Sequence, residues 1–551
     1  MEKNQISFAS NSMTPLQKGK ACVNCRRRKI KCDGDKPICG PCAKFSTTFG
    51  DCEYSEDGIS HAQMLEDQIS ILQARIEELE RPKQSRPSRP SSTRHHSSSS
   101  SSQVSSSNMS LGPLLSQFYM QQASRNPEMN SMPAELPFIV LEALVHNFLH
   151  HSSCFGFFLD TQAFHDSITH SQGRDLPPVL LNVMYLWGVH LSQDARIKAY
   201  EATFLALALR STAGSLSGTH PRTILHSLQA SVLLAYYFIR NARFVEGKYH
   251  TSAAVSIAVS SGLQQIRAPQ RHGSGLTVGM GAPALRPPRD AGEEGERISA
   301  FWTVLTLNNC WAGTDGSPSN VSYEGSSGLK IDTPWPLDRD DYVQFPHLLP
   351  LQNTDTIIKF LADVPDYNTS KAAMHAKAGV LFEEATRLAT RYRMLKQFES
   401  ALATLDRKID AFKTTLPAVQ CRDMLVVHML AHGATIHLHK ALAHQNMGSR
   451  VKALEAARAM AGVLRQIDVQ RIGLIDPVLA PLWTSACLTF ISEIKRGRQR
   501  MHDAASPSQI QAMTGALHTV IGVMEFFAPF CRLMDVQLAA VRLSYNDAFA
   551  G

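Results

Sequence analysis

Apolar residues recur at intervals of three and four positions along most of the chain after about residue 132. This spacing places them on one side of a helix with 3.6 residues per turn. Three such faces are Leu141, Val145, Phe148 and Leu149; Ile298, Phe301, Trp302 and Leu305; and Met460, Val463, Leu464 and Ile467. Alternating patterns typical of strands are scarce. The pattern predicts a mainly α protein, with a large all-α domain in two successive parts, 132–350 and 351–551.

Two stretches interrupt this helical pattern. Residues 268–292 are rich in glycine and proline, and residues 313–350 contain Ile331-Asp-Thr-Pro-Trp-Pro336. We expect both to be surface loops. Acidic residues at 293, 294 and 296 close the first stretch, where the dipole of a starting helix favours negative charge.

A different apolar spacing, with a period of seven, occupies residues 62–80. Isoleucine with leucine at alternate seam positions favours a parallel two-stranded coiled coil. The seam consists of Ala62, Leu65, Ile69, Leu72, Ile76 and Leu79. It spans under three heptads, so a short amphipathic helix packed on the distal domain remains an alternative. We interpret it as a dimerisation helix, ended by Pro82.

The remaining segments lack any apolar period. Residues 1–17 are polar, residues 55–61 form a short linker, and residues 81–131 are rich in serine and proline. Such composition buries too little apolar surface to offset the entropy of ordering the backbone. We expect 1–17 and 81–131 to be disordered.

Charge is concentrated in one short segment. The chain has a formal net charge of +7, and Lys18 to Lys31 contains seven basic residues and no acidic one. The rest of the chain is therefore formally neutral. This distribution favours one local nucleic-acid-binding face over a generally basic surface. Arg81 to Arg94 either adds to that charge or belongs to a solvated linker.

Six of the eleven cysteines lie close to this basic run, at Cys22, Cys25, Cys32, Cys39, Cys42 and Cys52. Paired Cys-x-x-Cys units in a reducing environment suggest zinc. Six thiolates hold two zinc ions only if two of them bridge. A disulfide knot needs an oxidising compartment, and residues 1–13 have no apolar core for a signal peptide. A lone redox pair leaves four cysteines unexplained. The other five cysteines are widely separated, and we expect them to be buried.

The segment 18–54 resembles the fungal binuclear zinc cluster family of transcription factors. The family pattern is Cys-x2-Cys-x6-Cys, a loop, Cys-x2-Cys and a last spacer, and Pro37 also matches. The last spacer here is longer than usual, at nine residues (43–51). The resemblance implies two zinc ions per chain held by the six cysteines, and a short helix that enters the major groove of double-stranded DNA.

By position in that family, Arg28 and Lys29 reach base edges, and Lys20, Arg26 and Lys31 lie near phosphates. Arg27 completes the predicted DNA-binding set. Because guanine offers two acceptors in the major groove, arginine or lysine is its usual reader. The resemblance further implies a nuclear regulator of RNA polymerase II genes that binds paired CGG-type triplets as a homodimer, together with transcription co-regulators.

The helical region also resembles the regulatory middle domain of the same family, over about 135–345. The matching residues are Gly247 to Gly262 and Glu294 to Trp302. In that family the domain controls the DNA-binding end, sometimes through a small-molecule effector. Two other readings stay open: a zinc-dependent protein-interaction adaptor, and a metabolite or redox sensor. The sequence does not distinguish an activator from a repressor.

Several other site types are not supported. No nucleophile elbow, Walker loop or paired catalytic carboxylates occur, so we expect no enzyme. His428, His432 and His439 share a helical face and suit a metal, but a polar stripe on a packed helix explains them as well. No apolar run comes near the roughly 20 residues that span a bilayer, Val179 to Val189 being the nearest, so we expect a soluble intracellular protein with no membrane partner.

Overall fold

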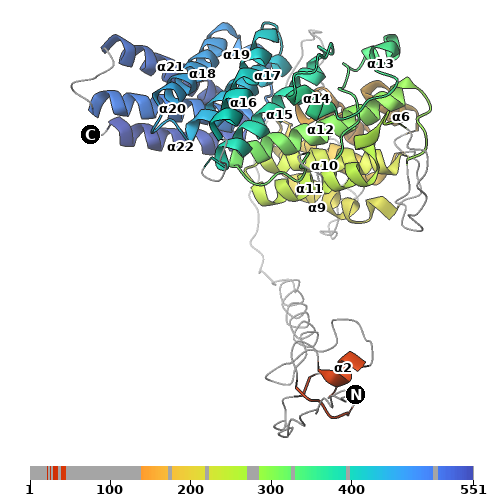
Figure 1. Cartoon of the computed structure of the whole chain (residues 1–551). Coiled ribbons are helices and arrows are strands. Elements are labelled where there is room, and N and C mark those ends of the chain that lie inside the picture. Colours follow the sequence, from red (N-terminus) through yellow and green to blue (C-terminus); the bar gives the residue numbers. More distant parts are fainter. Residues whose placement is uncertain are drawn as a thin grey trace, which may run out of the picture. The chain divides into compact units, whose positions relative to one another are not determined.

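In the computed structural model the chain divides into two compact units, Met1–Ser106 and Ser107–Gly551 (Figure 1). The structure describes residues 21–22, 25, 29–34, 39–44, 138–171, 176–217, 222–269, 285–323, 329–392, 398–499 and 507–549. The predicted tail (1–17), linkers (55–61 and 81–131) and coiled coil (62–80) lie outside these residues and stay predictions. So do the predicted roles of Lys20, Arg26, Arg27, Arg28 and Cys52.

The described part of the second unit is built of helices, as the periodicity predicts, and contains no strand. Its first half comprises α5 (Phe138–Leu149), η1 (Ser152–Phe155), α6 (Thr161–Ser171), α7 (Pro178–His190), α8 (Ala195–Lys198), α9 (Glu201–Ala213), η2 (Ser215–Ser217), α10 (Thr223–Arg240), α11 (Phe244–Ser260), η3 (Leu263–Gln265) and α12 (Ala291–Asp315).

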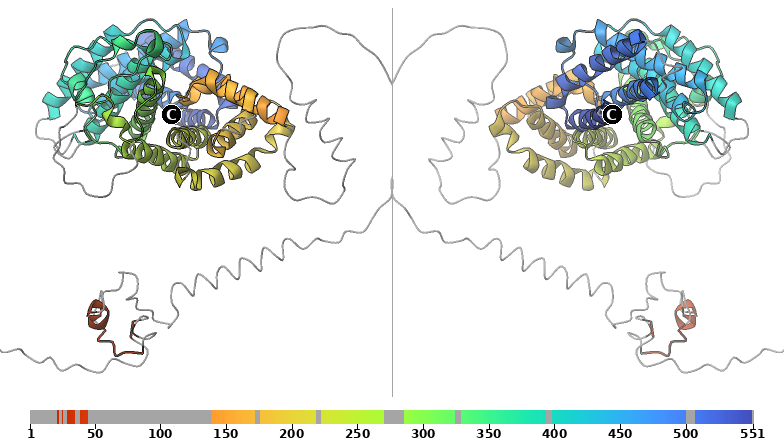
Figure 2. Two further views of the ribbon diagram at one scale, coloured as in Figure 1. Left: turned by 90° about the vertical axis from the view of Figure 1, so that its right-hand side faces the viewer. Right: turned by 90° about the vertical axis from the view of Figure 1, so that its left-hand side faces the viewer.

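The second half comprises α13 (Asp341–Gln344), η4 (Pro346–Leu348), α14 (Thr356–Leu361), α15 (Lys371–Thr390), α16 (Phe398–Thr415), α17 (Arg422–Lys440), α18 (Met447–Gln466), α19 (Val469–Ile472), α20 (Leu479–Gln499), α21 (Pro507–Phe527), η5 (Ala528–Phe530) and α22 (Arg532–Phe549). Figure 1 shows the chain progressing from α6 and α10 at one end of this unit to α20 and α22 at the other. Figure 2 views the unit from these two ends.

The core follows a series of helices that pack in succession. Helix α10 buries every side chain except Ile224, including the polar side chains of His226, Gln229 and Arg240. Helices α11, α12, α15, α17, α18 and α20 then each pack on the preceding member of the series. The predicted apolar faces at 141–149, 298–305 and 460–467 all lie in or against this core.

Helix α12 begins earlier than the loop prediction allowed. It starts at Ala291, so Gly292 belongs to the helix rather than to the loop. The side chain of Asp290 accepts a hydrogen bond from the amide of Glu293 at 2.8 Å and caps the first turn. The Asp-x-x-Glu spacing at 290–293 was the available signal for this start. The predicted acidic first turn is confirmed at Glu293 and Glu294.

The second predicted surface loop is in part wrong. Residues 331–337 are all buried. Trp335 stacks on Trp302 with ring centroids 4.3 Å apart, and the Trp302 indole donates to the carbonyl oxygen of Pro334 at 2.7 Å. Because proline has no amide hydrogen, two prolines reduce the number of donors that a buried segment must satisfy. This segment is therefore part of the protein interior and not a surface loop.

The expectation about apolar runs also needs a correction. Residues 507–530 are long and apolar enough, by length and composition, to cross a membrane. A core helix of a soluble protein passes the same test. In this structure α21 buries Met513, Leu517, Val520 and Met524 and packs on α18, α20 and α22. These contacts account for its apolar face.

Candidate metal centre and nucleic-acid interface

Four cysteines of the first unit converge on one point. Cys22 and Cys25 come from the start of the basic segment, while Cys39 and Cys42 flank the first turn of α2 (Gly40–Lys44). Their sulfur atoms lie 3.7 Å apart for Cys22 and Cys39, and 3.5 Å apart for Cys25 and Cys39. Cys42 Sγ is 3.7 Å from Cys22 Sγ and 3.9 Å from Cys25 Sγ. These distances suit a single metal ion held between the two Cys-x-x-Cys pairs.

These separations match a tetrahedral metal site. With a zinc–sulfur bond of about 2.3 Å, the edges of a tetrahedron of thiolates are about 3.8 Å long. All four sulfur-bearing residues are buried, so solvent does not compete for the position between them. The cysteines are not paired as disulfides. The donor set fits zinc, which prefers sulfur ligands in closed structural sites.

A second group of potential ligands shares one residue with the first. Cys32, Asp33 and Cys39 offer ligand atoms that lie within 4.8 Å of one another. Cys39 belongs to both groups and is therefore the described cysteine best placed to bridge two ions. Cys52, the sixth predicted ligand, lies outside the described residues.

Asp33 was not singled out from the sequence. Its Oδ2 accepts a hydrogen bond from the amide of Gly40 at 2.8 Å, so it caps the helix that presents Cys42. A Cβ at position 40 would lie 2.3 Å from that same oxygen. A larger residue at position 40 would therefore displace the Asp33 carboxylate from this hydrogen bond. Nothing in the local sequence predicts a cap seven residues before the helix.

The electrostatics of the metal-free cluster favour protons on sulfur. Burial, followed by hydrogen bonding with neighbouring thiols, raises the pKa of Cys22 well above its usual value. Burial likewise raises the pKa of Cys25 to about 12. Four thiolates this close repel one another unless a cation neutralises them. Metal binding at this site therefore releases protons and couples directly to folding.

The described residues near the end of the basic run include one with a left-handed backbone. The amide of Ile30 donates to the carbonyl oxygen of Cys25 at 3.1 Å. Lys29 lies in between with a φ of 55°, in the left-handed region. Lys29 and Lys31 are both exposed. The helix predicted between the second and third cysteines lies mostly outside the described residues, while both lysines are available to an outside anion.

Comparison with known proteins agrees with this geometry. Residues 20–57 match the fungal Zn(2)-Cys(6) binuclear cluster domain. These residues are a binuclear zinc cluster domain. Over 36 residues the chain is 58% identical to "Oleate activated transcription factor 3" of Kluyveromyces lactis. That match covers 6% of this chain and 5% of the relative. No solved structure gives a significant match to the chain.

The family match extends over the whole six-cysteine pattern, so it implies zinc binding by the binuclear cluster domain. The matched range includes the basic run and continues past Cys52 to residue 57. It does not reach the predicted coiled coil or the helical unit. The resemblance of the helical unit to a regulatory middle domain therefore stays a prediction.

Two sequence-based alternatives outside the cluster domain can be compared with the structure. Two of the three candidate histidines of α17 have separate partners: His439 Nε2 contacts Asp406 Oδ1 at 3.1 Å, while His428 Nε2 contacts the Pro417 carbonyl oxygen at 2.8 Å. Among the described residues, they form no group with metal-ligand spacing. Of the five scattered cysteines, four are buried as predicted, but Cys421 is exposed at the start of α17.

Proposed function

We propose that this protein is a nuclear, zinc-dependent transcription factor that binds double-stranded DNA in a sequence-specific manner. The observation that carries the proposal is the buried tetrathiol site of Cys22, Cys25, Cys39 and Cys42 beside exposed lysines at 29 and 31. The relative that shares this segment is named as a transcription factor. A basic face fixed to a metal-stabilised module is suited to the phosphate backbone and to guanine edges.

The proposal divides the basic residues by role. Arg28 and Lys29 read base edges of a CGG-type triplet, and Lys20, Arg26 and Lys31 lie near phosphates. Arg27 belongs to the same DNA-binding set. Phosphate contacts position the module without specifying sequence, whereas base contacts specify it. The exposure of Lys29 and Lys31 supports this division, because both side chains are accessible to DNA.

Dimerisation is the second part of the proposal. The apolar seam at residues 62–80 joins two copies as a parallel coiled coil and brings two cluster domains to one DNA site. A single module makes few contacts, so linking two raises the effective concentration of the second. The linker at 55–61 then limits the spacing between the two triplets.

Regulation by the helical unit is the third part. Its size and continuous core suit a domain that responds to partners, and we assign it a regulatory role over residues 132–551. Transcription co-regulators at RNA polymerase II genes are the corresponding protein partners. These roles are inferred from the resemblance of residues 135–345 to a regulatory middle domain. The family match at residues 20–57 does not bear on them.

The experiment is selection of binding sites from random duplexes with the full-length chain. The proposal expects enrichment of two CGG-type triplets at one fixed spacing. Selection of a single triplet would contradict the dimer but keep the DNA-binding role. If no motif were enriched while zinc stayed bound, the chain would instead be a zinc-dependent interaction adaptor.

A further inference from the structure

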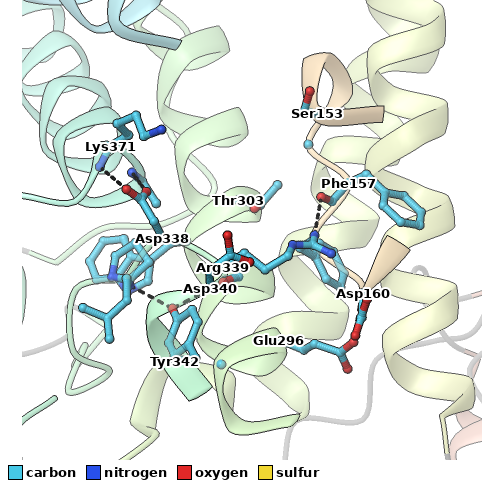
Figure 3. Close-up of a pocket in the computed structure, with 18 of the residues that line it drawn as sticks. Ser153, Phe157, Asp160, Glu296, Thr303, Asp338, Arg339, Asp340, Tyr342 and Lys371 are labelled. Atoms are coloured by element: carbon cyan, nitrogen blue, oxygen red, sulfur yellow. Dashed lines mark hydrogen bonds between the residues drawn. The ribbon is translucent and has the colours of Figure 1, made fainter. Parts of the chain in front are cut away.

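The helical unit contains a cavity of about 910 Å³ that DNA binding does not require. Its walls come from η1, α10, α12, α15, the start of α17 and the segment between α19 and α20. Figure 3 shows Thr303 of α12 in the middle of this cavity, with Ser153 and Phe157 on one side and Lys371 on the other. The volume is in the range of sites that hold small organic molecules.

Several aromatic side chains supply the buried part of the lining. Tyr236, Trp302 and Tyr342 are each less than a tenth exposed and all border the cavity. Phe157 and Phe158 are buried beside them. These rings offer an apolar surface, and their faces attract cations. A ligand with an aromatic or aliphatic body suits this part of the cavity.

The four arginines of the lining are already engaged, whereas Lys371, its one lysine, is exposed. Arg222 pairs with Glu296 at 3.3 Å, and Arg289 pairs with Glu293 at 2.8 Å. Arg422 donates to Ser153 Oγ at 2.9 Å. Arg339 donates to backbone carbonyl oxygens, including that of Phe157 (Figure 3). An anion bound at any of these arginines would have to compete with its present partner.

The carboxylates of the lining are in excess and one of them is buried without a cationic partner. Eight acidic side chains border the cavity, against five lysines and arginines. Asp476 is 8% exposed, and its carboxylate accepts hydrogen bonds from the amide of Val478 at 2.8 Å and from the Tyr236 hydroxyl at 3.4 Å. Among the described residues, no lysine, arginine or histidine forms an ion pair with it.

An isolated buried carboxylate is costly, because the protein interior replaces its hydration poorly. Burial accordingly raises the pKa of Asp476 to about 6. Neither Arg422 nor Arg240 contacts the Asp476 carboxylate. Their positive charges interact with it only at longer range. His375, which also borders the cavity, has no hydrogen-bond partner among the described residues. Both side chains leave polar atoms available to a ligand.

The geometry points to a binding site for a small organic amine, with its ammonium group at Asp476 and its apolar body against Tyr236 and Trp302. An ammonium supplies the cation that the carboxylate lacks and donates hydrogen bonds that its free lone pairs accept. A neutral alcohol lacks the charge, and a carboxylic acid repels the excess of acidic side chains. This site is independent of the proposed DNA-binding role.

Titration calorimetry on the full-length, zinc-loaded chain tests this assignment with three matched probes. These are 4-phenylbutylamine, 4-phenylbutan-1-ol and 5-phenylpentanoate, which share the ring and chain but differ in the terminal group. We expect the amine to bind at one site per chain with a Kd of about 1 mM or tighter. The alcohol should bind at least about tenfold more weakly, and the acid more weakly still.

Two variants and one control locate the site. Asp476→Asn keeps the side-chain volume and should weaken the amine about tenfold or more while leaving the alcohol unchanged. Thr303→Leu fills part of the cavity and should weaken both. Asp468→Asn changes an exposed carboxylate outside the cavity and should change neither.

Three results would overturn the assignment: no saturable binding of the amine, equal or tighter binding of the acid, or full amine affinity in Asp476→Asn. Thermal unfolding of each variant separates a lost site from a lost fold. If Asp476→Asn unfolds at or above the temperature of the unmodified chain, its weaker amine binding reports on the carboxylate itself.

Discussion

The amide of Ile30 donates a hydrogen bond to the carbonyl oxygen of Cys25 at 3.1 Å, and Lys29 beside it has a φ of 55°. The backbone of Lys29 adopts the left-handed conformation, which lets the chain turn between Cys25 and Ile30. Its side chain is exposed to solvent. The same residue therefore has a backbone role in the cluster domain and a proposed side-chain role on DNA. Substitutions separate the two.

Lys29→Gly and Lys29→Ala should both lose about 1–3 kcal/mol of binding to a selected DNA site and relax its base preference. Glycine adopts the left-handed region without cost, so Lys29→Gly should be more stable than Lys29→Ala by about 1 kcal/mol. Lys31→Ala should weaken all sequences alike and lower the salt dependence. Fluorescence anisotropy on matched and mismatched duplexes measures the first effect. Unchanged preference in Lys29→Gly would remove Lys29 from base readout.

The contact between Asp33 and Gly40 gives a second prediction. A Cβ at position 40 would meet Asp33 Oδ2 at 2.3 Å, so Gly40→Ala should displace the cap and tilt α2, which presents Cys42. Loss of such a cap costs about 1 kcal/mol. We expect a weaker apparent zinc affinity, measured by competition with a chelator. Gly34→Ala is a comparison variant: Gly34 has a φ of 84° and follows Asp33, so it strains the backbone beside the cap without adding a Cβ at position 40. Equal zinc affinity in Gly40→Ala and the unmodified chain would contradict the role of the cap.

Acid should destabilise the helical unit through His437. Burial lowers the pKa of this imidazole to about 4, and its ring nitrogens contact Thr386 Oγ1 at 3.0 Å and Ser485 Oγ at 3.2 Å. Because the unfolded side chain titrates near 6.5, roughly 3 kcal/mol of stability is lost as the pH falls from about 6.5 to about 4.

His437→Gln should therefore reduce the loss of stability between pH 6.5 and pH 4, measured by denaturant unfolding at each pH. Its stability at pH 7 should fall, because two hydrogen bonds are altered. His347→Gln, at an exposed position, should leave the pH dependence unchanged. An identical slope for His437→Gln and the unmodified chain would show that this imidazole is not held neutral by burial.

Asp476 acts in the opposite direction. Its pKa is raised to about 6 by burial, above the unfolded value of about 4, so the folded state binds the proton more tightly. Its destabilising effect is absent below about pH 4, grows up to about pH 6 and is then constant, at about 1–3 kcal/mol. Asp476→Asn should raise the free energy of unfolding at pH 7.5 and have little effect at pH 4. A variant that is less stable at pH 7.5 would mean that the carboxylate is compensated by its neighbours.

The fold class and much of the metal site follow from the sequence because both depend on local spacing. The apolar periods at 298–305 and 460–467 predict faces that are indeed buried, and the cysteine spacing brings Cys22, Cys25, Cys39 and Cys42 together. The loop at 331–337 could not be placed in this way. Its burial depends on contacts with Trp302 and with the carbonyl oxygen of Gln264, which are distant in the chain.

The cavity could not be predicted from the sequence either. Asp476 and Tyr236 are separated by 240 positions, and neither lies in a pattern that marks a site. The Asp33 cap could not be predicted either, because Asp33 lies seven residues before the amide of Gly40 that it accepts from. In each of these cases the functional contact comes from the packing of separate segments, whereas periodicity and motif spacing report only on neighbours along the chain.

The most direct test of the account is the number of zinc ions that the full-length chain retains in native mass spectrometry. Six thiolates with two bridges hold two ions, and Cys39 is the described residue placed to bridge them. The account predicts two zinc ions per chain, and fewer than two when Cys39 is replaced by serine. A single zinc ion in the unmodified chain, or none, would contradict the binuclear cluster on which the proposed DNA-binding role rests.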